Sequence, residues 1–118
     1  MKHKLPAEVA AAARAAQEKQ AVDMVLLDLT GRSSFTDYFL ISTVRNPRQG
    51  QAVSDEIQMQ LAREGLRPTH IEGYQQAEWI LMDYAYFVVH IFSQKSRVFY
   101  DLERLWRSAP RIPVEEAG

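Results

Sequence analysis

Two apolar runs of strand length, Met24–Leu29 and Phe39–Val44, constrain the fold of this chain more than any other feature. Continuous apolar runs of this length are typical of strands that are covered on both faces. Between them lies Asp28–Tyr38, a polar stretch much longer than the two residues that a simple hairpin needs. Its hydroxyl and carboxylate groups can hydrogen-bond the backbone and hold a loop in one shape. The stretch therefore predicts either a structural loop or a site between two strands.

The composition limits the classes of protein to which the chain can belong. Its 118 residues predict one domain, and no apolar run of about 18 residues is present that could span a membrane. The absence of cysteine excludes disulfides, thiol catalysis and thiolate metal sites. The net charge of -1 argues against nucleic acid as the main partner, because contacts with phosphates favour a basic surface. Glu8 and Glu18 argue against a cleavable targeting peptide, so we expect a cytoplasmic protein.

Three segments have helical patterns. Pro6–Gln20 is rich in alanine, and its thin apolar stripe predicts a helix that packs weakly. Asn46 is the expected N-cap of a second helix, which ends near Gly65. Ser93 is the expected cap of a third helix that reaches about Arg107. The apolar stripe of this third helix is predicted to contain Val98, Leu102 and Leu105, widened by Phe99 and Trp106.

Three further segments are predicted to be strands. Pro68–Gly73 belongs near a sheet edge, because proline cannot donate to a strand ladder. Glu78–Tyr84 and Phe87–Phe92 are so close in sequence that an antiparallel hairpin is the economical connection. The expected fold is α/β (α+β): a single domain with a five-stranded mixed sheet, three flanking helices and some open sheet surface. We expect this domain over residues 1–110 and a flexible tail over residues 111–118.

The sequence gives little support for catalysis. The three histidines are scattered, and His90 lies in an apolar strand, where a hydrogen-bonded core histidine is the favoured interpretation. The opening loop is faintly similar to nucleotidyltransferase sites, in which a Gly-Ser turn precedes two metal-binding carboxylates. Its corresponding residues, which we otherwise interpret as a loop scaffold, are Gly31, Ser33, Ser34 and Asp37. No second carboxylate follows Asp37, so we expect no metal, no cofactor and no enzyme. A metal-dependent nucleotidyltransferase-like enzyme is the alternative.

Acidic and aromatic residues around the fourth predicted strand favour a binding function. In a strand, Trp79, Leu81 and Asp83 share one face, whereas Glu78, Ile80 and Met82 share the other. A tryptophan beside a leucine and carboxylates suits the centre of an interface with a basic partner, such as a ribosomal protein or a nucleic-acid-bound protein. Composition alone favours the other interpretation, in which Trp79 and Leu81 belong to the core and Asp83 faces the hairpin end. The candidate partner-binding residues are Glu72, Tyr74, Glu78, Trp79, Leu81 and Asp83.

Motifs along most of the chain carry a resemblance to a known family. The longest is Leu27–Phe39, which contains the polar loop described above. The others include His70–Tyr74, Glu78–Trp79, Val88–His90 and Phe99–Trp106. In this order, from Val22 to Pro110, the chain resembles the ribosomal silencing factor family, also called the Iojap-like family.

The resemblance implies a non-enzymatic regulator of translation with a nucleotidyltransferase-like fold that lacks the catalytic carboxylates. Members of the family bind the large ribosomal subunit through its fourteenth large-subunit protein. They thereby block joining of the small subunit and repress translation under nutrient limitation, as in stationary phase. The resemblance also implies a possible homodimer off the ribosome, little direct nucleic-acid binding and a docking patch around Trp79.

The turn after Asp83 departs from the family pattern. The family has Gly-Asp where this chain has Ala85 and Tyr86. Because alanine tolerates a positive φ less well than glycine, we expect a longer hairpin turn or one of a different type.

Overall fold

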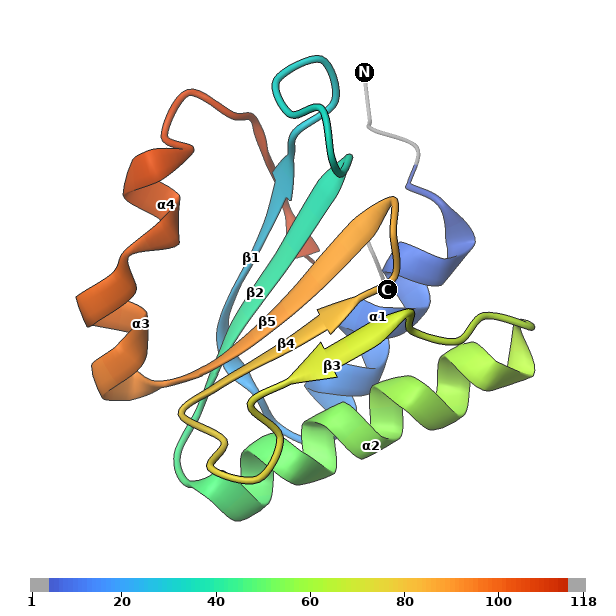
Figure 1. The fold of residues 1–118 in the computed structure, drawn as a ribbon, viewed down its shortest axis with the longest axis vertical. Helices are drawn as coiled ribbons and strands as arrows, with labels where there is room; N and C mark the ends of the chain where they lie inside the picture. Colours follow the sequence, from blue (N-terminus) through green and yellow to red (C-terminus); the bar gives the residue numbers. More distant parts are fainter. Residues whose placement is uncertain (1–4, 115–118) are drawn as a thin grey trace.

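A mixed sheet of six strands forms the centre of the molecule, in the order β3-β4-β5-β2-β1-β6 (Figure 1). The computed structural model describes residues 5–114. The strands are β1 (Val22–Asp28), β2 (Tyr38–Val44), β3 (His70–Glu72), β4 (Trp79–Asp83), β5 (Phe87–Ser93) and β6 (Arg111–Ile112). β2 and β5 run parallel, and the other neighbouring pairs are antiparallel. The predicted α+β fold is confirmed, with β3 at an edge as expected and with six strands instead of five.

Side chains that alternate along the central strands build two cores on opposite faces of the sheet. In β5, Phe87, Val89 and Ile91 belong to the first core, whereas Val88 and Phe92 belong to the second. β5 lies between β4 and β2, so nearly every side chain along it is buried. This two-sided burial explains why the strand is almost continuously apolar.

Helices α1 (Ala7–Glu18) and α2 (Pro47–Arg63) cover the first face of the sheet (Figure 1). Asn46 caps α2 as predicted, and its Oδ1 accepts a hydrogen bond of 2.8 Å from the Gln49 backbone N–H. The prediction that α1 packs weakly is wrong. Small side chains let a helix backbone approach its neighbours closely, so even a thin apolar stripe packs densely. The buried residues of α1 are Val9, Ala11, Ala12, Ala13, Ala15 and Ala16.

Helices α3 (Gln94–Tyr100) and α4 (Leu102–Leu105) follow β5 on the other side of the sheet (Figure 1). Ser93 caps α3 as predicted, with its Oγ accepting from the Ser96 backbone N–H at 3.1 Å. The expected single helix is interrupted, because Asp101 adopts the left-handed conformation with a φ of 48°. Arg97 spans the interruption and donates two hydrogen bonds, of 3.0 and 2.8 Å, to the Glu103 carboxylate.

The interruption at Asp101 changes which apolar side chains of this region are buried. Leu102 and Trp106 pack against the second core. Val98 and Leu105 are each 75% exposed and Phe99 is 78% exposed, so the predicted stripe does not form one buried face. Positions spaced for one continuous helix no longer line up when the chain changes direction between them. An apolar surface is therefore left on α3 and α4.

The chain returns to the sheet after α4. Arg111 and Ile112 form β6, which pairs with Leu26 and Leu27 of β1, and the Ile112 side chain enters the first core. The sheet thus continues past residue 110, where the sequence predicts the end of the domain. Residues 115–118 of the predicted tail lie outside the described residues. Within residues 5–114, no helix is long and apolar enough to cross a membrane.

Candidate functional site

The part of the second face formed by β3 and β4 is the candidate site. β4 alternates as predicted: Ile80 and Met82 are fully buried on the first face, whereas its other side chains point to the second face and are half-buried. β3 pairs with β4 so that Glu72 lies opposite Leu81 and His70 opposite Asp83. Partners in an antiparallel pair share a face. The resulting surface, which we call the β3–β4 face, comprises His70, Glu72, Trp79, Leu81 and Asp83.

Trp79 is the large aromatic side chain of this face. Its ring centroid lies 4.5 Å from that of Tyr100 on α3 and 5.0 Å from that of Phe92 on β5. Its indole Nε1–H donates a hydrogen bond of 3.0 Å to Nδ1 of His90. The indole is therefore packed against the protein and only partly exposed. The core interpretation thus describes part of the surroundings of Trp79, and the interface interpretation stays a prediction.

His90 lies beneath this face and is only 3% exposed. Burial lowers the pKa of its imidazole to about 3, because the charged form loses its hydration. The ring is therefore neutral at physiological pH, and because Nδ1 accepts from Trp79, its proton is on Nε2. The prediction of a hydrogen-bonded core histidine is confirmed. Its direct link to Trp79 was missed, although the short hairpin between β4 and β5 constrains the register that makes these residues neighbours.

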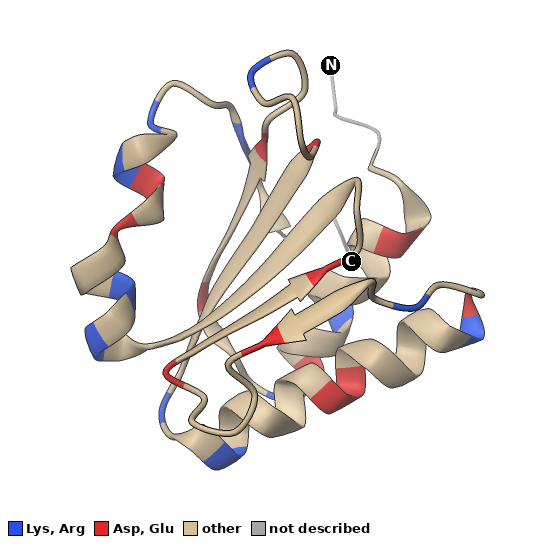
Figure 2. Cartoon of the chain, in the orientation of Figure 1, with Lys and Arg blue, Asp and Glu red and all other residues tan. Residues whose placement is uncertain are grey.

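Carboxylates surround the apolar centre of the face. Glu72 lies 2.6 Å from Nε2 of His70, and Asp83 accepts a hydrogen bond of 2.8 Å from the Ala85 backbone N–H. Glu78 precedes β4 and accepts from the Ser93 hydroxyl at 2.8 Å. Figure 2 shows acidic positions on β3 and β4, whereas the α3–α4 region carries both basic and acidic positions. The rim of the β3–β4 face is therefore acidic.

Tyr74 does not belong to this face. Its hydroxyl donates to Asp55 of α2 at 2.9 Å, and this hydrogen bond is the main reason why the pKa of Tyr74 is raised. The chain turns away at Gly73, which has a φ of 79°. A Cβ at Gly73 would lie 2.1 Å from the Trp79 carbonyl oxygen, so only glycine fits there without a shift of the backbone. Gly73 therefore fixes the approach of this loop to the start of β4.

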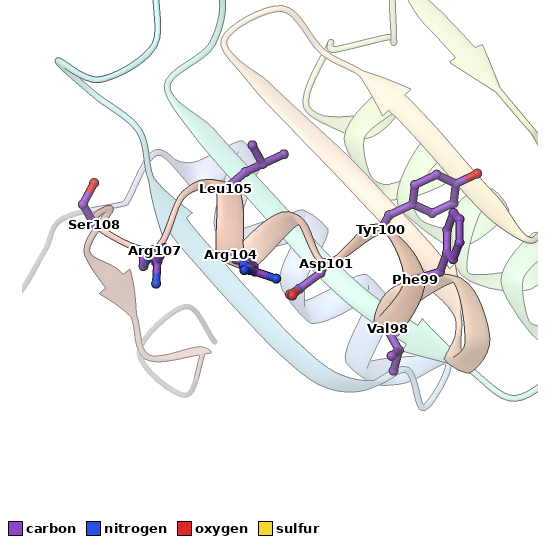
Figure 3. A pocket seen from close by; sticks show the side chains of 8 residues that line it. All are labelled: Val98, Phe99, Tyr100, Asp101, Arg104, Leu105, Arg107 and Ser108. Carbon is purple, nitrogen blue, oxygen red and sulfur yellow. The ribbon is translucent and has the colours of Figure 1, made fainter.

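The apolar surface on α3 and α4 adjoins the site through Tyr100. Figure 3 shows Phe99 beside Tyr100 at the end of α3, with Leu105 on α4. The rings of Phe99 and Tyr100 meet edge to face, with their centroids 4.9 Å apart. We call Val98, Phe99 and Leu105 the α3–α4 surface. It was missed because a continuous helix would have buried it; its only sequence signal was the wide apolar stripe of the last predicted helix.

The loop over residues 29–37 is held by its own hydrogen bonds. Asp28, which is nearly buried at the end of β1, accepts from the backbone N–H and the hydroxyl of Thr30 at 3.0 and 2.5 Å. The Ser33 hydroxyl accepts from the backbone N–H of Phe35 at 3.2 Å, and Gly31 has a φ of 77°. No side-chain hydrogen bond is recorded for Ser34 or Asp37 within residues 5–114. The same part of the chain holds no group of three or more His, Asp or Glu that could bind a metal ion.

Comparisons with known proteins agree on one family. The profile of "Ribosomal silencing factor during starvation" matches residues 2–118. The chain is 39% identical to "Ribosomal silencing factor RsfS" of Bacillus subtilis, over 88% of each chain. It is 36% identical to the protein of the same name from Halalkalibacterium halodurans, over 88% of this chain and 89% of that one. A crystal structure of a Chromobacterium violaceum protein superposes with a TM-score of 0.83, at 27% identity, covering 88% of this chain and 87% of the other.

Proposed function

The chain belongs to the ribosomal silencing factor family, and from this premise we propose that it binds the large ribosomal subunit at the fourteenth large-subunit protein. Bound there, it blocks joining of the small subunit by occupying the surface that the small subunit needs. Translation in the cytoplasm falls as a result when nutrients are limited. This is a binding function, which requires neither a metal nor a cofactor.

The observation that supports this proposal is the combination of an aromatic anchor and an acidic rim on the β3–β4 face. Trp79 and Leu81 are half-buried on a sheet face that no helix fully covers, and Glu72 and Asp83 lie next to them. Interfaces are typically centred on such anchors, with polar groups around them. A carboxylate rim favours a partner with lysine and arginine side chains, because opposite charges speed and orient the encounter.

The α3–α4 surface extends this face with exposed apolar side chains. Apolar clusters of this kind are common at sites of protein association. We propose that the same region is covered when two copies of the chain form a homodimer off the ribosome. Docking on the subunit and dimerisation then exclude each other, so ribosomes compete with the second copy.

A sedimentation experiment with separated subunits tests the docking proposal. The wild-type chain is expected to move with large subunits and not with small ones. Trp79→Ala should weaken this binding at least about tenfold, because an interface anchor is lost. Met59→Ala is the matched control: Met59 is an exposed apolar residue of α2, on the opposite face. Normal binding by a folded Trp79→Ala protein would show that the β3–β4 face is not the docking site.

A further inference from the structure

We propose that His90 is a positioning residue for docking: it holds the polar edge of the Trp79 indole inward, so that the partner meets only ring carbons. This inference rests on the proposed function, since it concerns the same face. The His90 side chain is buried, so no partner can contact it. Its proposed role is to control which edge of the Trp79 indole the partner contacts.

The strand register places the two side chains together. Trp79 lies opposite Phe92 and Leu81 lies opposite His90, so Trp79 and His90 are diagonal neighbours on one face. Side chains in this relation can reach each other across an antiparallel pair. The bond of 3.0 Å from Nε1 to Nδ1 uses the only hydrogen-bond donor that an indole has.

Aromatic side chains restrict the orientation of the Trp79 ring from other directions. Phe92 and Tyr100 lie against it, with centroid distances of 5.0 and 4.5 Å. Packing against rings limits tilt, but it does not distinguish the nitrogen edge of the indole from its carbon edge. The acceptor on His90 makes this distinction, because the unpaired N–H would otherwise be drawn to water or to a polar group of the partner.

The second nitrogen of His90 shows that the imidazole is not simply a well-satisfied core residue. Nε2 is buried and has no hydrogen-bond partner among the described residues. Burying a polar atom without a partner destabilises a fold, so an apolar ring would suit the core better at this position. What the imidazole provides and an apolar ring does not is the acceptor for Trp79.

Two substitutions separate the acceptor from the ring. His90→Asn keeps an acceptor, because Oδ1 of asparagine is as many bonds from the backbone as Nδ1 of histidine, but it loses most of the ring volume. His90→Phe keeps the ring and removes the acceptor. A structural role predicts that docking follows stability, with the phenylalanine variant the better binder. A positioning role predicts the reverse order of docking.

The experiment combines nitrogen NMR of the full chain with sedimentation on large subunits. We expect a scalar coupling between Trp79 Nε1 and His90 Nδ1 across the hydrogen bond, with Trp106 as the internal reference indole. His90→Phe should abolish this coupling and weaken docking about tenfold. In His90→Asn, the Trp79 indole N–H signal should show that the hydrogen bond persists, at a position different from that in His90→Phe. Although it is the less stable variant, His90→Asn should dock within about threefold of wild type.

The possible failures are distinguishable. An absent coupling in the wild-type chain, or normal docking by a folded His90→Phe protein, overturns the positioning role. The role is also overturned if docking follows stability across the two variants. Normal docking by folded Trp79→Ala overturns the proposed docking face, and this inference with it, whatever the NMR spectrum shows.

Discussion

The burial of His90 makes a quantitative prediction for the dependence of stability on pH. Burial lowers its pKa from the ordinary 6.5 to about 3 in the folded protein. The unfolded chain therefore binds a proton below pH 6.5 that the folded chain does not bind until about pH 3. Since the unfolded state then holds more protons, the free energy of unfolding decreases as the pH falls through this window.

The size of the effect follows from the shift. Each pKa unit corresponds to about 1.4 kcal/mol, so the full loss below both pKa values is about 5 kcal/mol. At about pH 5 the unfolded histidine is protonated and the native one is not, which gives a loss of about 2 kcal/mol relative to about pH 7.5. His90→Phe removes this contribution and leaves the other titrating groups in place.

Urea unfolding followed by circular dichroism, for wild type and His90→Phe across this pH range, measures the difference. The wild-type protein should lose about 2 kcal/mol more than the variant between about pH 7.5 and pH 5. The other titratable groups are the same in both proteins, so the difference between the two curves reports on His90 alone. Parallel curves for the two proteins would show that His90 titrates alike in the folded and unfolded chain, and the described burial would then be wrong.

Three further predictions concern the turns and the exposed helices. Ala85 has a φ of 73° in a γ-turn, in which the Tyr86 backbone N–H donates to the Tyr84 carbonyl oxygen at 3.0 Å. Because alanine is strained at a positive φ, Ala85→Gly should raise the free energy of unfolding by about 1 kcal/mol in urea titrations. Gly73→Ala should lower it by about 3 kcal/mol and shift the Trp79 indole NMR signal, because its Cβ would meet the Trp79 carbonyl oxygen. Leu105 is 75% exposed, so Leu105→Ser should change the free energy of unfolding by less than about 0.5 kcal/mol. In light scattering, the same substitution should shift the homodimer towards monomer. An unchanged dimer would exclude the α3–α4 surface as its interface.

The strands could be predicted because their patterns reflect local rules. The alternation in β4 follows from its burial on one face only, and the continuous apolar run in β5 follows from its burial on both. The hairpin turn between β4 and β5 was harder to predict. Ala85 was expected to alter the turn, and the strands are joined by a three-residue connection in which Ala85 adopts a positive φ. The Asp83 carboxylate bonds the Ala85 N–H and supports this conformation from the strand.

The errors come from positions where tertiary contacts override a local pattern. Nothing in the apolar spacing after Ser93 indicates a break at Asp101, yet aspartate is among the residues that adopt the left-handed conformation most readily. The break is compatible with the ion pair between Arg97 and Glu103, which are six positions apart and would not face each other on one helix. β6 has only two residues, too few for any sequence pattern to reveal.

The sequence indicates which residues belong to the candidate site more readily than it indicates how their side chains are arranged in space. Proximity in the sequence grouped Tyr74 with Trp79, but the turn at Gly73 sends the tyrosine to Asp55 on α2. The core and interface interpretations of Trp79 do not exclude each other, because the indole packs on Phe92 while the residue remains partly exposed. The orientation of the Trp79 ring at the surface therefore depends on the core residues against which it packs. Changes beneath the face, at His90 above all, should therefore alter docking without touching the partner.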